Sequence, residues 1–374
     1  MSIREKLYQM FILGTDGDGY KEALKNNLGG IIFFTKDIQS KEQFKNLIAD
    51  IKSISKTPPF LSIDQEGGRV ERTENIHNGK KYLSAKFAYE KGEDFLRKQT
   101  EEIAQELKDY GINLNFAPCI DVNTNPNNPI IGERAFSSNP DDVIRGEKIV
   151  SQIYRENGII PCVKHFPGHG DANADSHLTL PKIDLSLDEM EKTHIKPFRA
   201  CAKTIEMVMV AHLHCTCFEK DVIPTSFSKN AIDYLRNELG FEGIAISDDM
   251  VMEGAKLEGW RAGGMEVWQF NNNDVDKISQ KQQTDKNPST FQPFNLSTNN
   301  SHTSIHPYLQ PSATACETAI RAGINMFIYR NSTPETIQII ETIAEKAKYD
   351  KELEERIEEA VERIKSLKVE RLKS

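Results

Sequence analysis

Residues 159–181, IIPCVKHFPGHGDANADSHLTLP, are the stretch of sequence that decides the fold. They begin as a short apolar run, typical of a buried strand, and pass directly into a loop that is too polar and too rich in glycine for a core. Ionisable groups crowded at the end of a strand indicate a functional site, although any one of these histidines could simply cap the loop. The loop holds three of the nine histidines and two aspartates: His165, His169, His177, Asp171 and Asp175.

Size and composition restrict the classes of protein to which this chain can belong. Its 374 residues are enough for one large α/β barrel or for two ordinary domains, and 38% hydrophobic residues are enough for a buried core. The net charge of -9 argues against a general affinity for nucleic acid or anionic membranes, because both bind basic surfaces. We therefore expect a small or neutral partner.

The cysteines and the first residues both favour a cytoplasmic protein. Six cysteines are scattered through apolar stretches, so we expect reduced and buried thiols. The opening MSIREK lacks the apolar region of a secretion signal, and no apolar run is long enough to span a bilayer. We therefore expect the protein in the cytoplasm.

Apolar runs rich in β-branched residues recur along the chain, with amphipathic helical patterns between them. This alternation is typical of βα units and a parallel sheet. Eight such runs are recognisable, at 9–14, 29–34, 59–64, 113–118, 159–164, 206–211, 243–247 and 323–328. Helical patterns fall at 40–54, 94–109, 140–156, 228–239 and 314–322. Eight repeats predict an α/β fold of the closed (β/α)8 type, a TIM-type barrel.

Two segments depart from this repeat. Residues 257–312 are rich in Asn, Gln, Ser and Thr and far exceed an ordinary connection, so we interpret them as an unstructured insertion after the seventh strand, or as a lid. Residues 333–372 are helical by pattern and heavily charged, which predicts a surface helix with one apolar stripe, or a partner-binding coiled coil. We thus expect a catalytic barrel at 1–256 and 313–350, followed by a charged C-terminal helix at 351–374.

A barrel of this type carries its chemistry at the C-terminal ends of its strands, and those ends are polar here. One residue separates Asp175 from His177, so the carboxylate can accept a proton from the imidazole and raise the basicity of its other nitrogen, as a general acid/base requires. Asp248 ends a different strand and could act as a carboxylate nucleophile. Such a pair predicts retaining glycoside hydrolysis through a covalent glycosyl-enzyme. Other residues of this rim would hold sugar hydroxyl and amide groups: Asp64, Arg72, Arg134, Lys164 and His165.

These assignments have simpler alternatives. Asp248 and Asp249 end a strand, where an aspartate often caps the following helix, and Arg72 could form only a surface ion pair. A metal site is the competing interpretation of residues 212–217, HLHCTC, which hold ligand types that zinc prefers. Alternate residues of a strand face opposite ways, however, so the histidines and cysteines would not converge. We assign His212 instead to a contact with the substrate or with a residue beside it.

Four motifs together resemble glycoside hydrolase family 3, and within it the single-domain bacterial β-N-acetylglucosaminidases. These motifs are IDQEGGRVER at 63–72, IIGERAF at 130–136, KHFPGHGDANADSH at 164–177 and AISDDMVMEGA at 245–255. The resemblance covers most of residues 1–256 and 314–332. Several independent signatures in the same order leave little room for coincidence.

The resemblance implies a TIM-barrel hydrolase that removes terminal non-reducing N-acetylglucosamine from muropeptides, where it is linked to anhydro-N-acetylmuramic acid, during cytoplasmic peptidoglycan recycling. By motif position it implies Asp248 as the nucleophile and Asp175 with His177 as the acid/base dyad. No metal or organic cofactor is expected. We expect a monomer that acts on a small carbohydrate and binds neither nucleic acid nor a membrane. The residues that fall where the family contacts the sugar are Asp64, Arg72, Arg134, Lys164 and His165.

Two other functions stay open. A neutral imidazole does not repel an incoming phosphate as a carboxylate would, so phosphate could cleave the glycosyl-enzyme and the protein would be a phosphorylase. The segment at 257–312 also departs from the family, whose members pass almost directly from the nucleophile motif into the helix represented here by 315–323. If this insertion disrupts the site, the barrel would bind an amino sugar without cleaving it.

Overall fold

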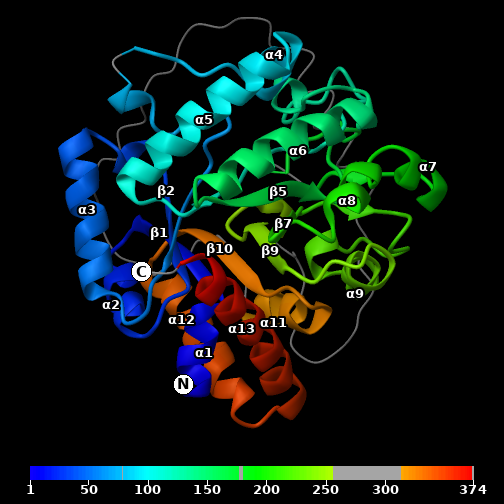
Figure 1. Ribbon diagram of the computed structural model, residues 1–374. Helices are drawn as coiled ribbons and strands as arrows, with labels where there is room; N and C mark the ends of the chain where they lie inside the picture. The colour runs from blue at the N-terminus through cyan, green and yellow to red at the C-terminus, as the bar shows by residue number, and fades with distance from the viewer. Residues whose placement is uncertain (78, 177–179, 256–312, 373–374) are drawn as a thin grey trace, which may run out of the picture. The chain divides into compact units, whose positions relative to one another are not determined.

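The computed structural model describes residues 1–77, 79–176, 180–255 and 313–372, and eight of its strands close into one parallel barrel (Figure 1). The strand order around the barrel is β1-β10-β9-β7-β5-β4-β3-β2. Each of the eight apolar runs identified in the sequence contributes one strand, which confirms the predicted α/β barrel. The strand bounds are β1 Phe11–Asp16, β2 Gly30–Phe33, β3 Phe60–Ile63, β4 Leu114–Asn115, β5 Ile160–Phe166, β7 Met207–Val210, β9 Ile244–Asp249 and β10 Met326–Asn331.

The first and last strands of the chain close the barrel. Phe11 of β1 is in register with Phe327 of β10, and their ring centroids lie 5.3 Å apart. Strands β2, β3, β5 and β7 are buried along their whole length, as a parallel sheet covered on both faces requires. Each fully buried Phe or Ile side chain contributes about 1.5–3 kcal/mol to the stability of this core.

Helices surround the barrel, and the long pair α5 and α6 lies side by side over one part of it (Figure 1). α5 ends at Gly111, whose φ of 78° suits glycine, and Asn139 caps α6 by accepting a hydrogen bond from the N–H of Asp141. The helix bounds are α1 Ile3–Gln9, α2 Gly19–Lys25, α3 Lys41–Ile54, α4 Ala85–Glu90, α5 Glu93–Tyr110, α6 Pro140–Glu156, α7 Leu187–Lys192, α8 Lys196–Cys201, α9 Lys229–Asp233, α11 Ala313–Ala322, α12 Pro334–Ala347 and α13 Lys351–Arg371.

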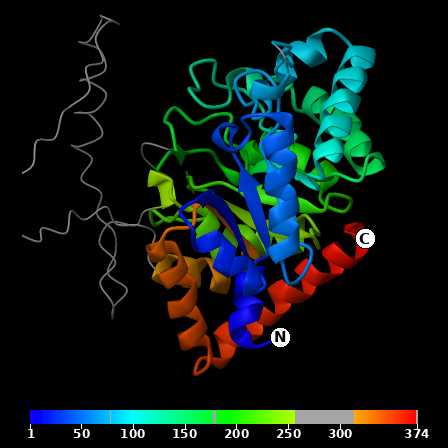
Figure 2. The ribbon, with the colours of Figure 1, turned by 90° about the vertical axis from the view of Figure 1, so that its left-hand side faces the viewer.

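The C-terminal helical pattern forms two helices rather than one. α12 and α13 are separated by residues 348–350, because the side chain of Asp350 accepts a hydrogen bond from the N–H of Leu353 and starts a new helix. α13 packs along one apolar stripe that includes the buried side chains of Ile357 and Ile364. Figure 2 shows α13, in red, at the same end of the molecule as α1. This is the end at which the barrel strands begin, because Lys368 contacts the carbonyl oxygen of Gly29.

Two features complete the fold of the described residues. A two-stranded parallel sheet that the sequence pattern did not predict pairs β6, Lys182–Ile183, with β8, His214–Cys215. Among the helices that the structure describes, none is both long and apolar enough to cross a membrane. The segment 257–312, predicted as an insertion or lid, lies outside the described residues.

Candidate active site

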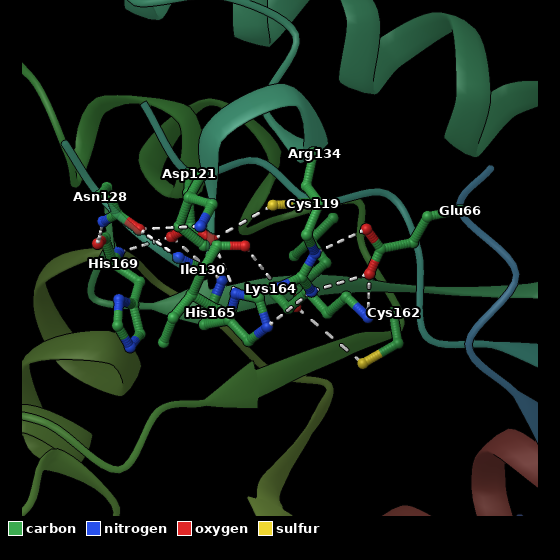
Figure 3. Close-up of polar contacts among 12 residues, drawn as sticks. Glu66, Cys119, Asp121, Asn128, Ile130, Arg134, Cys162, Lys164, His165 and His169 are labelled. Carbon is green, nitrogen blue, oxygen red and sulfur yellow. Dashed lines mark hydrogen bonds and ion pairs between the residues drawn. The ribbon is translucent and has the colours of Figure 1, made fainter. Parts of the chain in front are cut away.

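The ends of β3, β5 and β9 and the turn after β4 carry most of the residues predicted for the site. Asp64 follows β3, Lys164 and His165 lie in β5, and Asp248 lies in β9. Arg134 ends a short 3-10 turn, Gly132–Arg134, after β4. Figure 3 shows the side chains of Arg134, Lys164 and His165 converging beside Glu66.

Lys164 is paired with two carboxylates. Its Nζ lies 2.7 Å from Oδ1 of Asp64 and 2.6 Å from Oε1 of Glu66, and the residue is buried. Burial alone would lower the pKa of Lys164, but the two carboxylates outweigh burial and raise it. Lys164 is therefore a charged hydrogen-bond donor at neutral pH, held at a defined position.

Arg134 completes this ion-pair network. Its Nη2 and Nε donate to the two carboxylate oxygens of Glu66 at 2.8 and 2.9 Å, a bidentate arrangement. Burial would raise the pKa of Glu66, but Arg134 and Lys164 lower it well below its usual range. Because buried charges are tolerated only when they are paired, Glu66 is the group that allows both cations to lie under the rim.

His165 has a partner for each ring nitrogen. Nδ1 lies 2.6 Å from Oδ2 of Asp121, and Nε2 lies 3.3 Å from Nη2 of Arg134. A guanidinium can only donate, so Nε2 accepts and the proton resides on Nδ1, from which it is donated to Asp121. Burial would raise the pKa of Asp121, but the imidazole of His165 and the backbone N–H of His169 lower it.

The structure separates the two aspartates that could equally have capped a helix. The Asp249 carboxylate accepts from the backbone N–H groups of Val251 and Arg330, at 3.1 and 3.3 Å, and also pairs with the Arg330 side chain. Asp249 is thus committed to contacts that hold the fold together. Oδ1 of Asp248 accepts only from the N–H of Asp249, at 2.7 Å, within the described part of the chain.

Asp248 is ionised in a half-buried position. Burial would raise its pKa, but the nearby His165, His212 and Lys164 lower the pKa of Asp248 below its ordinary value. A half-buried carboxylate that stays ionised, with its side chain not committed to a structural ion pair, has the properties that a nucleophile needs.

His212 supports the backbone at Asp248. Nε2 of His212 donates to the carbonyl oxygen of Asp248 at 3.1 Å, and Nδ1 accepts from Oγ of Ser226 at 2.7 Å. The residue is fully buried, and burial lowers the pKa of His212, so the ring is neutral. His212 therefore contacts the backbone of Asp248 through one ring nitrogen. The sequence analysis suggested a contact either with the substrate or with a residue beside it.

The loop that carries Asp175 is held next to the turn after β9. The carbonyl oxygen of Ser176, which is buried, accepts a hydrogen bond of 3.0 Å from the N–H of Gly254. A Cβ atom at Gly254 would lie 2.9 Å from the carbonyl oxygen of His212 and 3.2 Å from that of Ser176, so only glycine permits this approach. Asp175 is half-buried. Its predicted partner His177 lies outside the described residues.

Arg72 lies at the rim and is half-buried. Its Nε is buried and has no hydrogen-bond partner within the described residues, and its guanidinium carbon lies 5.9 Å from the centroid of the Phe34 ring. Among the described residues Arg72 forms no ion pair, so the surface ion pair considered from the sequence is not found there.

The residues considered for zinc do not converge on one point. Sγ of Cys215 lies 3.2 Å from Sγ of Cys217, whereas His214 faces the carbonyl oxygen of Ile223 and His212 bonds as described above. All six cysteines are free thiols, and five of them are buried. Elsewhere in the described part of the chain, one group of side chains has possible metal-ligand atoms within 4.8 Å of one another: Cys119, Asp121 and His165. In this group the Asp121 carboxylate accepts hydrogen bonds from Cys119 and His165.

Three residues at the site received no role from the sequence: Glu66, Asp121 and His169. The sequence shows each of them near a strand end, but their partners lie far along the chain, as with Asp121 and His165, which are 44 positions apart. Burial lowers the pKa of His169 to about 4, and its ring nitrogens have no hydrogen-bond partner within the described residues. In the sequence, only their position as polar residues near predicted strand ends could have indicated a role for these three residues.

The chain resembles a known protein family and several individual proteins. Residues 2–263 match the family model for the glycosyl hydrolase family 3 N-terminal domain. The chain is 36% identical over 238 residues to a beta-hexosaminidase of Neisseria gonorrhoeae, covering 61% of this chain and 64% of that protein. It is 34% identical over 247 residues to a beta-hexosaminidase of Tolumonas auensis, covering 64% and 72%.

A further relative and one solved structure extend the comparison. Beta-hexosaminidase A of Pseudoalteromonas piscicida is 34% identical over 249 residues, but the match covers only 42% of its length. The chain thus spans less than two thirds of several of these relatives. A glycoside hydrolase family 3 beta-N-acetylglucosaminidase from Paenibacillus sp. superposes with a TM-score of 0.78 at 26% identity, over 100% of this chain and 63% of the other. The chain belongs to glycosyl hydrolase family 3.

Proposed function

We propose that this protein is a retaining exo-β-N-acetylglucosaminidase that hydrolyses terminal non-reducing N-acetylglucosamine from muropeptides. The observation that carries the proposal is Asp248, a half-buried and ionised carboxylate beside the paired side chains of Lys164 and His165. Membership of glycosyl hydrolase family 3 and the names of the relatives, beta-hexosaminidases, support the same chemistry.

Charged and polar groups on the rim would hold the sugar ring. The carboxylate of Asp64 accepts hydrogen bonds from hydroxyl groups, and Lys164, Arg134 and Arg72 donate to hydroxyl and amide oxygens. Because Glu66 already holds Lys164 and Arg134, these two side chains lose little entropy when the sugar binds.

In the first chemical step Asp248 would attack the anomeric carbon. A bond forms between a carboxylate oxygen of Asp248 and C1, the bond from C1 to the leaving oxygen breaks, and His177 gives that oxygen its proton. Water then attacks C1, transfers its proton to His177 and releases Asp248. Asp175 would orient His177 and stabilise its protonated form. The contact between Ser176 and Gly254 supports this assignment, because it holds the Asp175 loop against the turn that follows Asp248.

The substrate that we propose is a muropeptide in which N-acetylglucosamine is linked to anhydro-N-acetylmuramic acid. Its cleavage would belong to peptidoglycan recycling in the cytoplasm, with the protein acting as a monomer on a small carbohydrate. This finer assignment follows from the likeness of the sequence to the single-domain bacterial enzymes.

The test is release of 4-nitrophenol from 4-nitrophenyl β-N-acetylglucosaminide, with and without added phosphate, followed by cleavage of the muropeptide disaccharide. We expect release that does not depend on phosphate. Release that rises strongly with phosphate, with N-acetylglucosamine 1-phosphate as product, would identify a phosphorylase instead. No release under either condition would favour a barrel that only binds the amino sugar.

A further inference from the structure

We propose that Asp121 is a positioning residue of this active site, which fixes the tautomer of His165 and the start of the loop that leads to Asp175. The inference rests on the proposed glycosidase function. Asp121 lies after β4 and is completely buried, so its carboxylate acts on the substrate only through its neighbours.

One carboxylate holds both ends of the segment 165–169. Oδ1 of Asp121 accepts from the backbone N–H of His169 at 2.5 Å and from that of His165 at 3.4 Å, while Oδ2 accepts from Nδ1 of His165 at 2.6 Å (Figure 3). The thiol of Cys119 donates to the same oxygen, Oδ2, at 3.2 Å. Both carboxylate oxygens are therefore occupied by donors, as an ionised group requires when it is buried.

The segment around Asp121 also determines where the loop leaves the barrel. Nδ2 of Asn128 donates to the carbonyl oxygen of His169 at 2.9 Å. A Cβ atom at Gly170 would lie 1.7 Å from the carbonyl oxygen of Val122, so the loop backbone lies directly against the chain that follows Asp121. Asp121 and Asn128 thus anchor the loop at His169, and Gly170 lies against Val122, five residues before Asp175.

The tautomer of His165 depends on the charge of Asp121. Arg134 can only donate to Nε2 of His165, at 3.3 Å, so the ring proton must be on Nδ1. A carboxylate at position 121 accepts that proton. The ring is then fixed between an acceptor and a donor, and it presents one orientation to the sugar.

The substitution Asp121→Asn tests this arrangement with little change of shape. The amide oxygen can still accept from the N–H of His169, but the amide nitrogen can only donate toward Nδ1 of His165. The ring proton would then move to Nε2, where it faces the donors of Arg134. The segment therefore keeps the hydrogen bond from the N–H of His169. His165, in contrast, changes from the Nδ1–H to the Nε2–H tautomer and loses its hydrogen bond from Arg134, as expected when a carboxylate that orients a histidine becomes an amide.

The matched control is Glu206→Gln. Glu206 is another buried carboxylate in an ion pair, with its Oε1 2.9 Å from Nε of Arg155 and only 7% of its side chain exposed. It precedes β7, at the end of the barrel opposite the site. Loss of the Glu206 carboxylate should lower the stability of the fold without changing the tautomer of His165.

We would measure hydrolysis of 4-nitrophenyl β-N-acetylglucosaminide, and the 15N shifts of His165 in histidine-labelled protein, assigned with His165→Gln. For Asp121→Asn we expect kcat/KM to fall by about 100-fold or more, with the proton moved from Nδ1 to Nε2. Glu206→Gln should keep both the wild-type kcat/KM per folded molecule and the Nδ1 tautomer.

The outcomes separate the inference from the proposed function. Wild-type protein without turnover would refute the glycosidase, while the spectrum would still test the tautomer. Active wild-type protein in which Asp121→Asn keeps kcat/KM within about twofold would overturn the role of Asp121. If the variant does not fold, the wild-type spectrum decides, because a proton on Nε2 of His165 contradicts the arrangement directly.

Discussion

Asp248 and Asp249 are neighbours in the chain, yet they have different partners and different roles. Asp249 is committed to Arg330 and to the N–H of Val251, whereas the side chain of Asp248 accepts only from the next N–H within the described residues. The same division runs through the site. Glu66 and Asp121 hold other side chains and Asp64 pairs with Lys164, whereas Arg72 and Asp248 form no ion pair within the described residues.

Replacing Asp248 by Ala should abolish turnover while the protein stays folded. The variant lacks the carboxylate that would form the glycosyl-enzyme, so we expect kcat to fall by about 10⁴-fold or more. Hydrolysis of 4-nitrophenyl β-N-acetylglucosaminide and thermal unfolding would be measured together. Unchanged activity would remove Asp248 as the nucleophile.

Asp249→Asn should show the opposite pattern. It weakens the ion pair with Arg330, so the free energy of unfolding should fall by about 1–2 kcal/mol while the nucleophile is kept. Urea denaturation would measure the change. A fall in kcat as large as that of Asp248→Ala, in fully folded protein, would contradict the division of roles.

At the scale of elements, the site depends on loops that touch across strand ends. The turn after β9, which contains the short 3-10 segment Glu253–Ala255, contacts the Asp175 loop through Ser176. The β6–β8 sheet joins residues 182–183 to the chain beyond His212. The loop between β5 and β6 is thus anchored at both of its described ends.

Gly254→Ala should reduce catalysis more than stability. Its Cβ atom would lie 2.9 Å from the carbonyl oxygen of His212, so the turn or the Asp175 loop must move, and kcat should fall by about 10–100-fold. Gly158→Ala is the control, because a Cβ atom there meets nothing within 4 Å but its φ of 77° is unfavourable for alanine. This control should lose stability and keep its kcat. Equal kcat values in both variants would refute the loop contact.

Lys368 of α13 predicts a pH dependence of stability. The residue is half-buried but its ammonium is enclosed beside the carbonyl oxygen of Gly29, and burial lowers its pKa to about 7. Between pH 7 and its ordinary pKa of 10.5 the unfolded chain binds the proton and the folded one does not, so stability rises with pH in this window.

The measurement is urea denaturation of wild type and Lys368→Met between pH 7 and 10. Relative to the variant, the wild-type free energy of unfolding should rise by up to about 1 kcal/mol per pH unit, and the difference should be constant below pH 6. Parallel curves for the two proteins across the whole range would show that Lys368 stays protonated in the folded state.

At the scale of the molecule, the described residues contain a complete barrel. All eight strands lie within 11–249 and 326–331, and β1 pairs with β10 to close the sheet. We therefore predict that deleting residues 262–310 leaves a folded barrel. The deletion variant should unfold in a single cooperative transition and keep its activity toward the nitrophenyl substrate. Loss of the folded state would show that this segment is structural.

Much of this molecule is determined by the sequence itself. Alternating apolar runs and amphipathic patterns depend on local chemistry, so they predicted the eight strands, most helices, and the polar strand ends where a barrel carries its site. The motif at 164–177 indicated Lys164, His165 and Asp175 for the same reason. The division of the helical pattern at 333–372 into α12 and α13 depends on one capping aspartate, Asp350.

Only the tertiary structure decided which groups meet. The pairing of Glu66 with Arg134 and Lys164, of Asp121 with His165, and of Asp249 with Arg330 joins distant parts of the chain. Spacing cannot reveal such pairs, because barrel closure brings strand ends together whatever their separation in sequence. Burial then makes each pairing obligatory, since an unpaired charge there would cost several kcal/mol. That physical requirement commits Asp249 to Arg330, whereas Asp248 has no ion pair within the described residues.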